Sequence, residues 1–267
     1  MTITSTFSDG DAYELQMGRW SRRLAEPFLD FAGTADGEQI LDVGCATGSL
    51  TFAIAKRSNV KSICGIDSSK AYIEAATKTN LDPRIEFRVG NACELPFADH
   101  VFDRVFSLLV LHFIPKTELA IKEMLRVARP GATVAAAVWD IRGGLVHQRI
   151  FFDIAAMLDP KAGEVRAQQF TRPMSRPGEL ETAWRAAGFQ NVQNAPIMIR
   201  MEFDSFNDYW MPCIGGQAAV GSYVATLSEA QRNELRKHMQ LAYLDGEPDG
   251  PRSYAAVAWT VKGIVSG

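Results

Sequence analysis

The 267-residue sequence lacks the features that mark secreted, membrane-spanning and zinc-binding proteins. Its four cysteines, at positions 45, 64, 93 and 213, form no CxxC pair, which argues against a disulfide framework and a zinc site. The N-terminus has no basic stretch followed by an apolar core, so no secretory signal is expected. The most apolar stretches are too short or too interrupted by charge to cross a bilayer. We therefore expect a cytoplasmic protein that needs no metal.

The chain also lacks an excess of positive charge. Its 28 Lys and Arg residues are offset by 31 Asp and Glu residues, which gives a formal charge of −3. This balance provides no general attraction to nucleic acid or to anionic membranes, so neither is expected as a partner. With 47% hydrophobic and 22% charged residues, the chain can bury a sizeable core. The composition leaves the oligomeric state open.

Segments with strand character alternate with segments of helical character along the chain. Apolar runs predict strands at 39–43, 60–66, 85–89, 102–110 and 133–139, and helical patterns predict helices at 49–57, 69–79 and 116–128. Such alternation is typical of parallel strands connected by helices. Two further strand-like segments, 192–203 and 254–265, extend the count. The fold class predicted is α/β, with a doubly wound, mostly parallel, seven-stranded sheet.

The remaining segments predict one domain over residues 1–267. An amphipathic helix over 17–31 places an N-terminal helical cap in 1–38. Helices are also expected at 145–158 and 178–187, within a core made of 39–203 and 252–267. The aromatic and glycine-rich segment 204–251 then becomes a helical insertion before the last strand. We expect it to cover the site as a lid.

Three predicted strands end in residues suited to hold a ligand. Ligands of a doubly wound sheet bind beside the carboxyl ends of its strands. There the sequence places a turn between Gly44 and Gly48, where glycine lets the backbone approach a ligand closely. Asp67 ends the second strand and can accept hydrogen bonds from a ribose diol. Asn91 follows the third strand and can pair with an adenine edge.

The glycine spacing distinguishes between two kinds of nucleotide cofactor. A dinucleotide fingerprint requires G-x-G-x-x-G, but Ala46 and Ser49 stand at the second and third glycine positions. A cofactor with adenosine and no phosphates does not need those glycines, and S-adenosylmethionine is the obvious candidate. Tyr13 and Arg19 in the N-terminal segment can bind its methionine carboxylate.

Taken together, the motifs resemble those of class I S-adenosylmethionine-dependent methyltransferases of the small-molecule type, similar to ubiquinone and menaquinone biosynthesis enzymes. The matching segments are ILDVGCATGSL (40–50), GIDSS (65–69), VGNACELPFADHVFDRV (89–105), SLLVLHFI (107–114) and RVARPGATVAAAVW (126–139). The resemblance implies a Rossmann-like fold and S-adenosyl-L-methionine as the methyl donor, with S-adenosyl-L-homocysteine as the product.

The resemblance also assigns roles within the cofactor site. It implies that Asp67 holds the ribose and that Asn91 contacts the adenine. It also implies that the turn at Gly44, Cys45 and Ala46 runs alongside the methionine and the ribose. Two departures from the family pattern are Ala46, which replaces a common glycine, and Asn91, which replaces a common aspartate. The remaining residues that we assign to the cofactor site are Ser68, Ala92 and Leu108.

The acceptor side of the site is less marked in the sequence. His112 follows the fourth strand and is the candidate general base, with a pocket-shaping role as the alternative. Aromatic and polar residues after the core strands can line a substrate pocket, or form an ordinary hydrophobic core. The acceptor-binding candidates are Trp139, Trp210, Gln217 and Tyr223.

We therefore expect methyl transfer to an O, N or C nucleophile of a small organic molecule. A nucleic-acid methyltransferase is the first alternative, although Ser107 to Val110 replaces the Asn/Asp-Pro-Pro-aromatic tetrapeptide that stacks a flipped base. A nicotinamide-dependent oxidoreductase is disfavoured by the missing glycines. A non-catalytic protein that keeps the cofactor pocket stays open.

Overall fold

The computed structural model describes residue 10, residues 13–215 and residues 218–267. The chain divides into two compact units. The first, which we call the sheet unit, comprises Trp20–Trp139, Pro173–Ile197 and Ala258–Gly267. The second, the helical unit, comprises Asp140–Arg172 and Met198–Val257 together with the described residues up to Arg19. Each unit is built around its own core.

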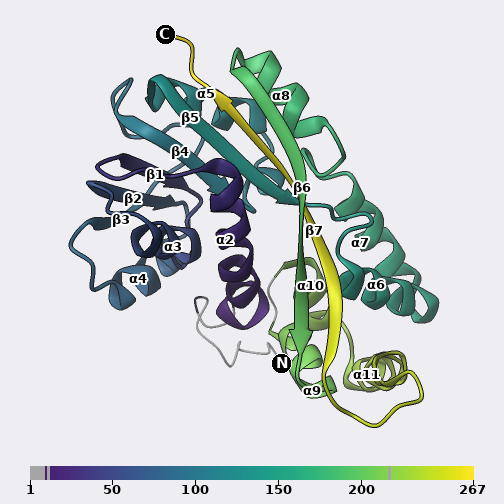
Figure 1. The fold of residues 1–267 in the computed structure, drawn as a ribbon. Coiled ribbons are helices and arrows are strands. Elements are labelled where there is room, and N and C mark those ends of the chain that lie inside the picture. The colour runs from purple at the N-terminus through teal and green to yellow at the C-terminus, as the bar shows by residue number, and fades with distance from the viewer. Residues whose placement is uncertain (1–9, 11–12, 216–217) are drawn as a thin grey trace. The chain divides into compact units, whose positions relative to one another are not determined.

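The seven strands form one sheet in the order β3-β2-β1-β4-β5-β7-β6 (Figure 1). β1 pairs in parallel with β2 and β4, β2 with β3, and β4 with β5, whereas β7 pairs antiparallel to β5, for example through Val134 and Gly263. This order confirms the predicted doubly wound, mostly parallel fold. The strand bounds are β1 Gln39–Val43, β2 Ser62–Asp67, β3 Ile85–Val89, β4 Phe102–Leu108, β5 Ala128–Trp139, β6 Gln190–Phe203 and β7 Arg252–Ile264.

Helices cover both faces of the sheet unit (Figure 1). Neighbouring residues of a strand point to opposite faces of the sheet. Val105 and Phe106 of β4 therefore pack into the apolar cores on the two faces. Val105 belongs to an apolar cluster that includes Met124 and Trp184, whereas Phe106 meets Phe28 edge to face at 5.7 Å. The helices that cover the sheet are α2 Arg19–Ala32, α3 Ser49–Arg57 and α4 Lys70–Thr79 on the Phe106 side, and α5 Thr117–Val127 and α8 Glu179–Ala187 on the Val105 side.

Two helix starts in the sheet unit follow the local sequence. Ser69 caps α4 by accepting a hydrogen bond from the N–H of Tyr72 at 3.3 Å. The predicted N-terminal helix is present as α2, which continues through Pro27, and a π-helical turn, η1 Glu14–Gly18, precedes it. The chain therefore enters the fold as one continuous helical segment.

The helical unit contains a helix that the sequence did not indicate. Its elements are η1, α6 Val146–Leu158, α7 Pro160–Phe170, α9 Phe206–Trp210, η3 Met211–Ile214, α10 Ala218–Ala225 and α11 Glu229–Leu244. The unpredicted α7 begins at Pro160, directly after Asp159, whose carboxylate accepts from the N–H of Lys161 at 3.0 Å. The segment 204–251 lies entirely in this unit, which also takes in residues 140–172.

Aromatic side chains form the core of the helical unit around α9 and α11. Tyr243 of α11 lies 5.8 Å from Phe206 and 5.5 Å from Tyr209, measured between ring centroids. Its hydroxyl donates to the carbonyl of Gly250 at 2.8 Å, which satisfies the one polar atom of the ring. No helix in the described part of the chain is long and apolar enough to cross a membrane.

Candidate functional site

The loop after β1 is a tight turn whose backbone enters the left-handed region three times. The φ angles are +76° at Gly44, +46° at Ala46 and +91° at Gly48. A Cβ added at Gly44 would lie 2.3 Å from a methyl carbon of Val110, so only glycine fits there without a shift. The N–H of Gly44 donates to the carbonyl of Ile66 at 2.7 Å. The turn is therefore held against the end of β2.

Asp67, at the end of β2, is fixed by the same turn. One carboxylate oxygen accepts from the N–H of Ala46 at 3.0 Å, and the other accepts from the N–H of Ser69 at 2.8 Å. Burial raises the pKa of Asp67 above its usual value, against the lowering effect of these backbone bonds. Each oxygen keeps a further acceptor position, so the carboxylate can still receive a diol. The structure thus brings Asp67 and Ala46 together, and binding of a ribose at Asp67 stays a prediction.

Asp42 is a site residue that the sequence reasoning missed. It is the penultimate residue of β1, with 1% of its surface exposed, and one oxygen accepts from the hydroxyl of Thr51 at 2.6 Å. The other oxygen, Oδ1, has no hydrogen-bond partner within the described residues. Burial raises the pKa of Asp42 to about 7. The sequence signal that could have identified Asp42 is an acidic residue two positions before a glycine turn at the end of a strand.

Asn91 lies beyond β3 and uses its side chain to shape its own loop. Its Oδ1 accepts from the N–H of Cys93 at 2.9 Å, and the N–H of Glu94 donates to its backbone carbonyl at 3.0 Å. The amide oxygen that was expected to face adenine is thus already engaged once. The side chain is exposed, as is Ser68, whereas Ala92 is partly buried. Binding of adenine at Asn91 stays a prediction.

The segment after β4 buries the candidate base. Leu109 takes a left-handed φ of +64°, and a 3-10 turn, η2 Leu111–Phe113, follows. His112 in this turn is 2% exposed, with its ring 4.1 Å from that of Phe113. Leu108 and Cys45 are also buried. The proton-transfer role of His112 stays a prediction, since a buried ring in a turn also shapes a pocket.

Arg19 has its close partners within the helical unit. One guanidinium nitrogen lies 2.9 Å from both carboxylate oxygens of Asp208, and the guanidinium lies 5.0 Å from the ring centre of Phe203. The ring of His147 lies 5.9 Å from that of Phe203, and burial together with Arg19 lowers the pKa of His147 to about 4. Asp208 and His147 are therefore partners that the sequence reasoning did not assign.

The acceptor-binding candidates are buried side chains. Trp210 is 4% exposed, and Tyr223 is 6% exposed and donates its hydroxyl to Asp159 at 3.1 Å. Trp139 ends β5, and its indole N–H has no partner within the described residues. Gln217 lies outside the residues that the structure describes. The roles of these residues and of Tyr13, which precedes η1 and is partly buried, stay predictions.

Metal-binding residues do not gather in the described ranges. Across these ranges, no three His, Cys, Asp or Glu side chains are grouped so that they could hold a metal ion. The side chains around the turn after β1 are instead carboxylates bonded to backbone N–H groups and one hydroxyl. Such acceptors suit hydroxyl and amino groups of an organic ligand.

Known proteins match this chain in sequence and in fold. A family model described as "Methyltransferase domain" matches residues 41–136. The demethylmenaquinone methyltransferase of Bacillus licheniformis is 32% identical over 66% of this chain and 81% of its own length. The 27-O-demethylrifamycin SV methyltransferase of Amycolatopsis mediterranei is 35% identical over 42% of this chain, which spans 43% of that relative.

A solved structure of low sequence identity shows the same fold. The Haemonchus contortus phosphoethanolamine N-methyltransferase 2, crystallised with S-adenosyl-L-methionine, matches with a TM-score of 0.59 and 17% identity, covering all of this chain and 58% of that one. The family model covers the strands and turns that carry Gly44, Asp67, Asn91 and His112. With most of the Bacillus relative matched at 32% identity, the chain is an enzyme of the methyltransferase family.

Proposed function

We propose that this enzyme transfers the methyl group of S-adenosyl-L-methionine to an O, N or C nucleophile of a small organic molecule. The observation that carries the proposal is the turn after β1, locked against β2 through the Ala46 N–H and the Asp67 carboxylate. A hydrogen-bond acceptor for a ribose diol and a backbone turn that a ligand can approach closely thus lie together at the carboxyl ends of β1 and β2. The names of the relatives, which act on demethylmenaquinone and demethylrifamycin, support a small acceptor.

The residues at this edge fit the donor. Asp67 would hold the ribose hydroxyls, since both of its oxygens are fixed and retain acceptor capacity. Gly44 allows Val110 to pack against the turn, because a Cβ there would lie 2.3 Å from a methyl carbon of Val110. The free Oδ1 of Asp42 offers an acceptor for an amino group. No glycine pattern for a pyrophosphate accompanies them.

The catalytic task left to the chain is positioning. The bound donor supplies a sulfonium that is already activated for methyl transfer, so we propose neither a metal nor an obligatory base. Holding two reactants in line contributes several kcal/mol, on the order of 7 or more in favourable cases. His112 would accept the proton of an acceptor that must lose one. Trp139, in the same unit as His112, would give the acceptor an apolar surface, and acceptor binding at Trp210 and Tyr223 of the helical unit stays a prediction.

Binding of S-adenosylhomocysteine, measured by isothermal titration, tests the donor site. We expect Asp67→Asn to weaken binding about 10- to 100-fold, because it removes a charged acceptor worth about 1.5–3 kcal/mol. Glu74→Gln is the matched control, since Glu74 is an exposed carboxylate on α4 that pairs with Lys70. Wild-type protein that fails to bind the product would refute the proposal.

Turnover separates an enzyme from a protein that only binds the cofactor. We expect release of S-adenosylhomocysteine when the enzyme is incubated with S-adenosylmethionine and a panel of small hydroxylated acceptors, with demethylmenaquinone and 27-O-demethylrifamycin SV among them. A panel of RNA and DNA substrates is the comparison. Methylation of nucleic acid alone would favour the first alternative function.

A further inference from the structure

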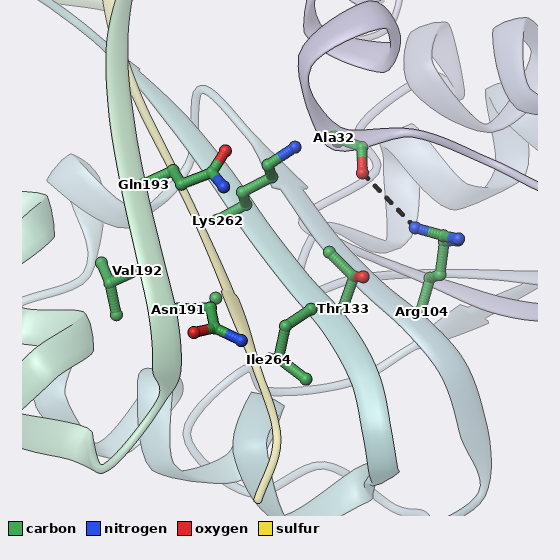
Figure 2. Close-up of a pocket in the computed structure, with 9 residues that line it drawn as sticks. Ala32, Arg104, Thr133, Asn191, Val192, Gln193, Lys262 and Ile264 are labelled. Carbon is green, nitrogen blue, oxygen red and sulfur yellow. Dashed lines mark hydrogen bonds between the residues drawn. The ribbon is translucent and has the colours of Figure 1, made fainter.

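A cavity lies in the sheet unit at the amino-terminal ends of β4 and β5, whereas the turn after β1 lies at the carboxyl ends of the parallel strands. It has a volume of about 620 Å³, within the size range of small-molecule sites. Arg104 and Thr133 line it from the amino-terminal parts of the parallel strands β4 and β5, where they pair with each other (Figure 2). The proposed cofactor residues Gly44, Asp67 and Asn91 lie instead at the carboxyl ends of β1, β2 and β3. The cavity is therefore separate from the proposed donor site.

The cavity carries a net positive charge. The ammonium of Lys262 lies 2.7 Å from the carbonyl of Phe31 and 5.0 Å from the centre of its ring, and forms no ion pair with a carboxylate in the described part of the chain. Arg104 is neutralised by Glu38 at 2.6 Å and also donates to the Ala32 carbonyl at 3.4 Å. Lys262 thus supplies one uncompensated charge to a partly enclosed space, where it is screened less than at an open surface.

Neutral polar groups stand beside this charge. The amides of Asn191 and Gln193 on β6 and the hydroxyl of Thr133 line the same cavity as Lys262 (Figure 2). None of the three side chains has a hydrogen-bond partner within the described residues, so their donors and acceptors are available to a ligand. Asn191 also holds a left-handed φ of +50°, which sets the start of β6. A cation that shares a cavity with two amides and a hydroxyl suits a ligand with one anionic group and several hydroxyls.

We propose that this cavity binds a small hydroxylated organic anion, with its phosphate or carboxylate on Lys262 and its hydroxyls on Asn191, Gln193 and Thr133. The site is independent of the methyl donor, because all of its polar groups lie at the end of the sheet where the parallel strands β4 and β5 begin. Cavities of this size hold drug-sized organic ligands, which are much larger than a free phosphate ion. A sugar phosphate or a sugar acid meets both requirements.

Backbone amide NMR with three matched probes tests the proposal. Glucose 6-phosphate, gluconate and glucose share a polyol frame and differ in the anionic group. We expect either anion or both to shift the amides of residues 133, 191–193 and 262–264 with a dissociation constant near or below about 1 mM, while amides 44–48 and 67 stay in place. Binding of one anion alone would assign phosphate or carboxylate as the preferred group. Absence of these shifts, or equal shifts with glucose, would overturn the proposal.

Variants assign the binding to the named side chains. We expect Lys262→Met to weaken anion binding at least five-fold, whereas Lys122→Met, which removes an exposed lysine of α5, leaves it unchanged. Asn191→Gly and Gln193→Ala remove exposed side chains, and glycine tolerates the left-handed φ of Asn191, so both should preserve the fold and each should weaken binding about two-fold. Wild-type affinity in Lys262→Met, or in both amide variants, would refute the assignment. Binding of S-adenosylhomocysteine should be the same in all four variants, which separates this test from that of the donor site.

Discussion

At the scale of single residues, two glycines allow the stability cost of a left-handed backbone to be measured apart from the cost of side-chain crowding. Gly44 and Gly131 have φ angles of +76° and +79°, but a Cβ would strike Val110 only at Gly44. Gly131→Ala should cost about 1–2 kcal/mol, the usual penalty of a left-handed Cβ. Gly44→Ala should cost about 1–3 kcal/mol more, because it also overpacks the turn. Urea unfolding of the two variants measures this difference.

A second substitution shows whether the crowding has the proposed cause. Val110→Ala removes the two methyl carbons closest to the added Cβ, at 2.3 and 2.5 Å. It should therefore restore part of the stability in the Gly44→Ala background and none in the Gly131→Ala background. Equal costs for the two glycine variants would show that Gly44 serves backbone conformation alone.

Residue-level predictions succeeded where the structure depends on adjacent sequence. The turn at Gly44 and the carboxylate of Asp67 follow from a motif and its place at strand ends, and the structure brings Ala46 and Asp67 together. The burial of Asp42 and the Asn91–Cys93 hydrogen bond did not follow. They depend on how side chains and loop backbone pack in three dimensions, which residue spacing does not encode.

At the scale of elements, one ion pair joins segments 189 residues apart. Arg19 begins α2 and Asp208 lies in α9, and their side chains are 31% and 26% exposed. We expect a double-mutant cycle of Arg19→Gln and Asp208→Asn, read by urea unfolding, to give a coupling of about 1 kcal/mol. The exposed Lys70–Glu74 pair at 3.5 Å is the control, with at most about 0.5 kcal/mol.

The same variants decide the role of Arg19 in cofactor binding. If Arg19 mainly positions α9, both variants should change the affinity for S-adenosylhomocysteine equally and slightly. If it binds the methionine carboxylate, as the sequence predicted, Arg19→Gln should weaken binding well beyond Asp208→Asn. A coupling near zero would instead show that the pair contributes nothing to the helical unit.

Elements with strong periodicity were predicted well, and their extensions were not. The buried strands were recognisable as apolar runs, but β5 begins at Ala128 and was expected at 133. Its early part pairs Ala128 with Phe102 across an irregular register that includes Pro130 and Gly131. Helix α7 was missed because its sequence has no regular apolar face and contains Pro160 and Gly163. Long-range pairing and capping decide such cases.

At the scale of the whole molecule, the alternation of strands and helices was enough to predict the sheet. The grouping of the other segments was not predictable, because it depends on single long-range contacts. The hydroxyl of Tyr209 donates to the carbonyl of His147 at 2.9 Å, and that of Tyr223 donates to Asp159. These bonds place residues 140–172 with the segment 204–251. The insertion and its function as a substrate cover remain predictions.

The pH dependence of stability should reflect two buried groups with opposite effects. The fold lowers the pKa of His147 from 6.5 to about 4, so it favours the neutral ring, and this stability is lost as pH falls from 6.5 towards 4. The fold raises the pKa of Asp42 from 3.8 to about 7, so it favours the protonated carboxyl, and this stability is lost as pH rises from 3.8 towards 7. The two effects oppose each other between pH 4 and 6.5.

Removing each group in turn should expose the effect of the other. His147→Gln keeps the effect of Asp42 alone. Lowering the pH from 6.5 to 4.5 should therefore raise the free energy of unfolding of this variant relative to that of wild type. In Asp42→Asn only His147 remains, and the change should have the opposite sign. Each shift should be about 2 kcal/mol, since a full proton contributes about 1.4 kcal/mol per pH unit and each group titrates over most of these two units. Urea unfolding of the three proteins at both pH values measures the shifts. Shifts of the same sign in both variants would show that these groups do not control the acid stability, because their pKa changes require opposite signs.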